Sequence, residues 1–188
     1  MNQTGKDAVP VVWVDGDSCP VPIRDILVRW HGRGRLVLHF FTNRRLPLDS
    51  SVGQTVVTDG TVDGHILARL QSIADATGKD PTDDIVTDDI VVITRDIPLA
   101  ERCLEYPCTV MNDRGTVFTR DTVGERRSLR DARAGIRAMG LESMDRRRTF
   151  GIKEQKLFSD ALDRVLSSLA KSRTIYASNS INFNRLDN

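Results

Sequence analysis

The stretch that sets the expected fold is VVWVDGDSCPVPIRDIL, residues 11–27. It begins with β-branched and aromatic residues over Val11–Val14, which is typical of a short buried strand. A turn of aspartate, glycine and serine follows, and prolines at positions 20 and 22 introduce an amphipathic helix over Val21–Trp30. Strand, polar turn and helix in this order predict the first unit of an α/β fold.

The alternation of strand and helix continues through most of the chain. Because parallel strands need helical crossovers, it predicts a single α/β domain in which helices cover both faces of a mostly parallel central sheet. Weaker strand patterns occur at Gln54–Val57 and Thr116–Phe118, the second in a hairpin around Asn112–Gly115. The other predicted strands are Leu36–Phe41, Ile90–Thr94 and Cys108–Met111, and the other helices of this part are Gly64–Ala76 and Pro98–Leu104.

The last third of the chain is predicted to be mostly helical. Over Glu125–Met139, apolar residues recur at helical spacing, and an arginine stripe runs one residue ahead at positions 126, 130, 133 and 137. A second amphipathic helix is predicted over Lys153–Leu169, so the domain is expected to span residues 11–169. Residues 170–188 are rich in Ser and Asn and are predicted to form a polar, flexible tail.

The composition favours a cytoplasmic protein without a structural zinc. The 188 residues suffice for one core of this type, and 27 basic against 26 acidic side chains give no general attraction to nucleic acid or membranes. Three cysteines without zinc-type spacing indicate a reducing compartment. Residues 1–10 lack the apolar stretch of a signal peptide, and no run has the roughly 18 apolar residues that a membrane span needs. The sequence leaves the oligomeric state open.

Polar residues follow each of the main predicted strands. Because ligands bind beside the carboxyl ends of parallel strands, these residues are expected to meet in one cleft. Carboxylates held close together repel one another unless a cation lies between them, and oxygen ligands suit Mg²⁺ or Mn²⁺ better than zinc. The residues expected in the cleft are Asp15, Asp17, Asn43, Asp96 and Asn112, and the three aspartates are the predicted metal ligands.

Each of these residues also has a simpler explanation. Asp and Asn often follow strands because they cap helices and stabilise turns, and Asp17 or Ser18 could cap the helix at Val21–Trp30. Cys19 could act as a nucleophile at that helix start, but no histidine is near it in the sequence, which favours a small buried residue. The arginine stripe could bind phosphates or form a solvated flank.

Four segments of the chain resemble the YaiI/YqxD family of uncharacterised bacterial proteins, which belongs among the PIN-like folds. They are WVDGDSCPVPIRDIL from Trp13, VITRDIPLAE from Val92, MNDRGTVFTRDTVGERRSLRDARAGIRAMG from Met111, and FSDALDRVL from Phe158. In order and spacing they cover about residues 11–169. The resemblance implies a three-layer PIN-like domain with an acidic cleft.

The resemblance also implies an acid carried by a helix, and two residues compete for that place. Asp63 fits the upstream spacing, whereas Asp83 is nearer the strand at Ile90–Thr94 but leaves too little room for a helix. Asp63 is therefore preferred, and Thr77–Asp89 is interpreted as an acidic insertion. The predicted metal ligands are then Asp15, Asp63 and Asp96, the catalytic residues Asp15, Asp17 and Asp96, and the nucleic-acid contacts Asn43, Asn112, Arg114, Arg126 and Arg130.

Three functions are compatible with these residues. The first is a nuclease that depends on Mg²⁺ or Mn²⁺ and acts on RNA or DNA, as the PIN-like resemblance implies. The second is a non-catalytic RNA- or protein-binding module whose arginines grip phosphates. The third, ranked well below the nuclease, is a haloacid-dehalogenase-like phosphatase with Asp15 as nucleophile and Asp17 as general acid, because VDGDSC and FFTN imitate two motifs of that family.

Overall fold

A six-stranded sheet forms the centre of the computed structural model, which describes residues 9–77, 90–128 and 150–183. The strand order is β3-β2-β1-β4-β5-β6, and every neighbouring pair is parallel except β5 and β6. β6 returns antiparallel to β5 through a tight turn, in which Gly115 adopts a positive φ of 79°. The strands are β1 (Val11–Asp15), β2 (Val37–Thr42), β3 (Gly53–Val56), β4 (Ile90–Ile93), β5 (Thr109–Met111) and β6 (Val117–Phe118).

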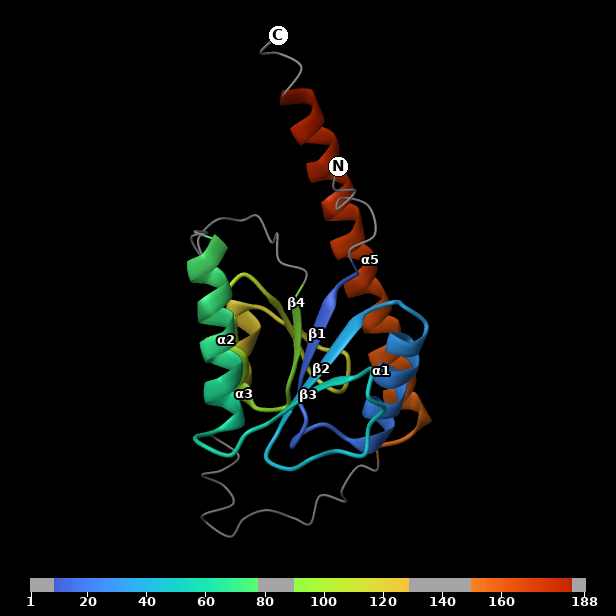
Figure 1. Cartoon of the computed structure of the whole chain (residues 1–188), viewed down its shortest axis with the longest axis vertical. Helices are drawn as coiled ribbons and strands as arrows, with labels where there is room; N and C mark the ends of the chain where they lie inside the picture. Colours follow the sequence, from blue (N-terminus) through green and yellow to red (C-terminus); the bar gives the residue numbers. More distant parts are fainter. Residues whose placement is uncertain (1–8, 78–89, 129–149, 184–188) are drawn as a thin grey trace.

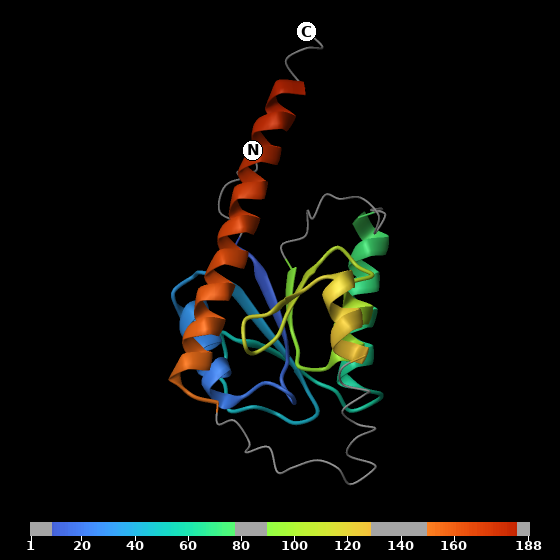
Figure 2. The same ribbon diagram turned by 180° about the vertical axis from the view of Figure 1, so that it is seen from behind.

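Helices cover both faces of the sheet and make the domain three-layered, as the sequence predicted. Figure 1 shows α1 and α5 on one face and α2 and α3 on the other, and Figure 2 shows the same layers from behind. The described helices do not include one that is long and apolar enough to cross a membrane. They are α1 (Val21–Gly32), α2 (Val62–Thr77), α3 (Ile97–Cys103), α5 (Ile152–Phe183) and a helical segment at residues 120–128.

The alternation of side chains along β1 divides the core between the two outer layers. Val12 and Val14 are buried and pack in one cluster with Phe158 of α5. Trp13, which lies between them, faces the other layer, and its ring meets that of Phe41 edge-on at 5.6 Å between centroids. β1 is therefore buried on both faces, as is typical of the centre of a parallel sheet.

β1 also lies where the winding of the sheet reverses. From β1 the chain adds β2 and then β3 on one side, and α2 then carries it across to β4 and β5 on the other side. In open parallel sheets, ligands bind outside the carboxyl ends of the strands at such a reversal. The ends of β1 and β4 therefore mark the expected place of a functional site.

The helix that carries the predicted arginine stripe begins earlier than the sequence pattern indicated. Residues 120–128 are helical, although the apolar spacing predicted a start at Glu125. The hydroxyl of Thr119 accepts a hydrogen bond of 3.2 Å from the backbone N–H of Thr122 and so caps the earlier first turn. Arg130 and the later arginines of the stripe lie outside the described residues.

α5 is longer than the sequence predicted. It continues through Phe183 instead of ending near Leu169, so residues 170–183 are helical. The prediction relied on the Ser and Asn content of this segment, but no glycine or proline interrupts it. A helix that has already formed can extend through residues of modest propensity, because nucleation is the unfavourable step.

Candidate functional site

Asp15 is the last residue of β1, and its side chain is almost completely buried. The residue is 5% exposed, and its Oδ2 accepts a hydrogen bond of 2.9 Å from the hydroxyl of Thr94. Its Oδ1 accepts a longer hydrogen bond, 3.4 Å, from the backbone N–H of Ser18. A carboxylate has about four acceptor positions, so these two donors orient Asp15 while using part of its accepting capacity.

Gly16 brings the turn after β1 against the end of β2. Its backbone N–H donates to the carbonyl oxygen of Phe41 at 2.9 Å, and a Cβ at this position would come within 2.5 Å of Cγ2 of Thr42. Only glycine allows this approach without displacing a neighbour. Asp17 consequently lies beside Asn43, whose backbone N–H donates to the two oxygens of the Asp17 carboxylate at 3.2 and 3.1 Å.

Thr94 connects the ends of β1 and β4. The residue is 1% exposed, and its hydroxyl, which donates to Asp15, also accepts a hydrogen bond of 3.0 Å from the backbone N–H of Asp96. One hydroxyl therefore fixes the two aspartates relative to each other. Asp96 is in addition the N-cap of α3, because its Oδ1 accepts from the backbone N–H of Leu99 at 3.2 Å.

Asp63 brings a carboxylate from α2 toward the same place. It lies in the first turn of α2, where the helix dipole favours a negative charge. Partial burial raises the pKa of Asp63, and the negative charges of Asp96 and Asp15 raise it further. Asp63 lines the same pocket as both aspartates. Asp83, the other residue considered for this role, lies outside the described residues.

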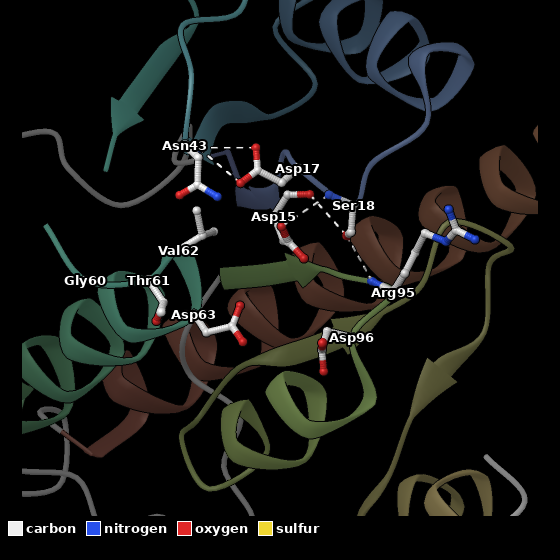
Figure 3. A pocket seen from close by; sticks show the side chains of 10 residues that line it. All are labelled: Asp15, Asp17, Ser18, Asn43, Gly60, Thr61, Val62, Asp63, Arg95 and Asp96. Atoms are coloured by element: carbon white, nitrogen blue, oxygen red, sulfur yellow. Dashed lines mark hydrogen bonds between the residues drawn. The ribbon is translucent and has the colours of Figure 1, made fainter. Parts of the chain in front are cut away.

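These side chains line one open pocket of about 660 Å³ at the carboxyl ends of the central strands (Figure 3). In Figure 3 the side chains of Asp15, Asp63 and Asp96 surround the same space, while the carboxylate of Asp17 is turned toward Asn43. The structure thus brings together five of the residues that the sequence singled out. The pocket is lined by Asp15, Asp17, Ser18, Asn43, Gly60, Thr61, Val62, Asp63, Arg95 and Asp96.

Asn112, which the sequence predicted to face this pocket, is not part of its lining. Its side-chain oxygen accepts hydrogen bonds of 2.9 Å from the backbone N–H groups of Arg114 and Thr116, and it thereby shapes the turn between β5 and β6. Arg114 is exposed on this turn and does not line the pocket either. For Asn112 the turn-forming explanation therefore accounts for the side chain.

Arg126, a predicted phosphate contact, packs against the β6 hairpin. Its Nη2 donates to the hydroxyl of Thr116 at 3.3 Å, and its guanidinium carbon lies 5.6 Å from the centre of the Phe118 ring. The next residue, Arg127, forms an ion pair of 2.6 Å with Glu101 of α3. In the described part of the helix, the arginines therefore have contacts within the protein.

The side chains of the first turn of the site do not cap α1. The N-cap of α1 is Pro20, and no side chain caps this helix, so neither Asp17 nor Ser18 is present as its cap. Cys19 is 7% exposed, and burial, partly offset by the charge of Arg24, raises the pKa of its thiol to about 12. Cys19 therefore packs as a small buried residue, the role that the sequence favoured.

Three residues that shape the site were not among the sequence candidates: Ser18, Thr94 and Arg95. Thr94 ends an apolar run, where a β-branched residue is ordinary and gives no hint of a polar role. The available signal was a hydroxyl at the end of a buried strand, immediately before an Arg-Asp pair. Arg95 lines the pocket and forms an ion pair with Asp113.

The donors in the pocket are of the kind that Mg²⁺ and Mn²⁺ prefer. Asp15, Asp63 and Asp96 offer carboxylate oxygens, and a cation between them would relieve the repulsion that raises the pKa of Asp63. Among the described residues, no three His, Cys, Asp or Glu side chains are grouped closely enough to hold a metal by themselves. Mg²⁺ commonly uses one or two carboxylates, several waters and substrate phosphates, and this pocket suits that mode of binding.

Comparisons with known proteins cover nearly the whole domain. The family model described as "Uncharacterized BCR, YaiI/YqxD family" matches residues 13–168. A UPF0178 protein of Treponema denticola is 37% identical over 162 residues, which is 86% of this chain and 95% of that protein. A UPF0178 protein of Psychromonas ingrahamii is 32% identical over 165 residues, 86% of this chain and 98% of that protein. No solved structure matches the chain, so its likeness to PIN-like folds stays a prediction. By the family model and these relatives, the chain belongs to the YaiI/YqxD family.

Proposed function

We propose that this protein is a nuclease that depends on Mg²⁺ or Mn²⁺ and hydrolyses phosphodiester bonds in RNA or DNA. The observation that carries the proposal is the convergence of Asp15, Asp63 and Asp96, which come from separate elements, on one open pocket. This pocket lies at the reversal of the sheet, where α/β proteins bind ligands. One or two of these carboxylates would hold the metal, and waters and a substrate phosphate would complete its coordination.

The chain's own residues would position the reacting groups. A bound metal supplies an activated water and neutralises the charge that develops on the phosphate. The hydroxyl of Thr94 keeps Asp15 and Asp96 in a fixed relation, so the metal would meet preorganised ligands. Asn43 is exposed at the rim, where its amide can contact a substrate, and the exposed Arg95 offers positive charge.

The geometry does not favour a phosphatase with Asp15 as nucleophile. The haloacid-dehalogenase motif requires a lysine in the site, and the described residues that line this pocket include no lysine. Asp17, which would be the general acid, is turned toward Asn43 and accepts its backbone N–H (Figure 3). The non-catalytic binding module remains the alternative that an experiment has to separate from the nuclease.

The proposal is tested by incubating the protein with labelled single-stranded RNA and DNA in Mg²⁺, Mn²⁺ or a chelator. We expect cleavage that requires the metal. Asp15→Asn and Asp63→Asn should each lower the rate by about 100-fold or more, because even partners outside the direct ligands contribute about 10- to 100-fold. Asp25→Asn is the matched control, since Asp25 is an exposed aspartate of α1 outside the pocket. Binding without cleavage under every metal condition would favour the non-catalytic module and overturn the nuclease.

A further inference from the structure

A buried aspartate lies beside the pocket without lining it. Asp113 is in the turn between β5 and β6 and is 4% exposed. Its carboxylate forms an ion pair with Arg95, with 3.4 Å between Oδ2 and Nε. Burial raises the pKa of Asp113, and the positive charges of Arg95 and Arg114 oppose this effect. A carboxyl group is rarely buried unless it is paired, and the partner of Asp113 is Arg95.

Arg95 is held near its inner end and exposed at its outer end. It lies just after β4, lines the pocket, and has 54% of its side chain exposed. Because the contact with Asp113 uses Nε, the two terminal nitrogens of the guanidinium lie beyond this anchor. Figure 3 shows the side chain leaving the rim of the pocket on the side away from Asp63. A guanidinium fixed in this way is well prepared to bind an anion.

We propose that Arg95 binds a phosphate of a single-stranded nucleic acid, next to the phosphate at the aspartate pocket, and that Asp113 is the positioning residue for Arg95. This inference rests on the proposed function and names a substrate subsite for it. The four aspartates of the pocket repel a polyanion unless fixed positive charge lies beside them. Asp113 restricts Arg95 before binding, which reduces the rotamer freedom that the complex would otherwise lose.

Equilibrium binding of a fluorescein-labelled single-stranded RNA, and of DNA with the same sequence, tests the subsite in a chelator. Arg95→Gln should weaken binding by about 10-fold or more, as expected for a charge-assisted hydrogen bond, and should lower the magnitude of the log–log salt slope by about 0.7. Asp113→Asn separates positioning from simple electrostatics. It removes a negative charge, which alone would strengthen binding, whereas the loss of Arg95 positioning should weaken it.

Arg33→Gln is the matched control, because Arg33 is an exposed arginine at the far end of α1. If Arg95→Gln and Arg33→Gln bind equally well with the parent's salt slope, the subsite does not exist. If Asp113→Asn fails to fold, Arg95→Gln with a parental melting curve still decides the question. A parent that binds through Arg95 but never cleaves would refute the nuclease and keep the subsite. Cleavage with an unchanged KM in Arg95→Gln would refute the subsite and keep the nuclease.

Discussion

Gly16→Ala is expected to disturb the pocket through the close approach of β1 and β2. The new Cβ would lie 2.5 Å from Cγ2 of Thr42 and 3.2 Å from the carbonyl oxygen of Phe41. Neither neighbour yields easily, because Thr42 is fully buried and the Phe41 oxygen already accepts the Gly16 N–H at 2.9 Å. The turn that joins Asp15 to Asp17 must therefore move away from β2.

Two effects of Gly16→Ala follow from this movement. Overpacking costs about 1–3 kcal/mol, and the Tm of a chain of this length falls by about 2–4 °C per kcal/mol, so the Tm should drop by about 2–12 °C. The movement also separates Asp17 from the N–H of Asn43 and shifts Asp15 against Thr94. The affinity of the pocket for Mn²⁺ should therefore fall as well.

Circular dichroism during heating measures the change in Tm, and calorimetric titration measures the affinity for Mn²⁺. Gly32→Ala is the control, because a Cβ at Gly32, at the end of α1, meets nothing within 4 Å. Alanine at this position should leave the Tm unchanged or raise it. Equal Tm values for the two variants, together with parental Mn²⁺ binding, would refute the steric reasoning about Gly16.

Three further results are expected. Thr94→Val removes the hydroxyl between Asp15 and Asp96 and should lower the free energy of unfolding in urea by about 1–3 kcal/mol. Thr94→Ser keeps the hydroxyl and should stay near the parent. Equal decreases in the free energy of unfolding for the two variants would contradict the role of the hydroxyl. Mn²⁺ at about 100 times its Kd should raise the parent's free energy of unfolding by about 2.7 kcal/mol. If Mn²⁺ stabilises Asp15→Asn by the same amount, Asp15 is not a ligand. The pKa of Asp63 is higher in the folded chain than in the unfolded chain, so the free energy of unfolding without metal should decline as the pH rises from the unfolded-state pKa to the folded-state pKa. Asp63→Asn should flatten this decline. A pH profile of Asp63→Asn that runs parallel to the parent's would argue against repulsion among the carboxylates.

The main strands could be predicted because buried parallel strands are short apolar runs between polar turns. β1, β4 and β5 agree with the predicted runs to within one residue at either end. The order of the strands was beyond the sequence, because the pairing of β1 with β4 is a contact between segments far apart in the chain. Alternating strands and helices indicate a layered sheet but do not say which strands are neighbours.

The candidate site could be predicted in part for the same reason. Asp15 and Asp96 follow parallel strands, whose carboxyl ends share one edge of the sheet. Asn112 and Asp113 follow the same strand, but the turn after β5 uses Asn112 to bind its own backbone and places Asp113 against Arg95. The different roles of Asn112 and Asp113 depend on the local conformation of the turn and on a contact between two strand ends. Neither of these features leaves a periodic pattern in the sequence.

A purely structural role does not account for the acidic pocket. Asparagine in place of Asp96 would still cap α3, without the repulsion that raises the pKa of Asp63. Without a cation, the repulsion among these carboxylates lowers the stability of the fold. They lie at the reversal of the sheet, where a destabilising group of charges usually has a functional reason. The ion pair of Arg95 with Asp113 adds a positioned cation at the rim of the same pocket. The proposed metal site next to the proposed phosphate subsite is the arrangement that a metal-dependent phosphodiesterase requires, whereas a module that only binds nucleic acid has no need of the aspartates.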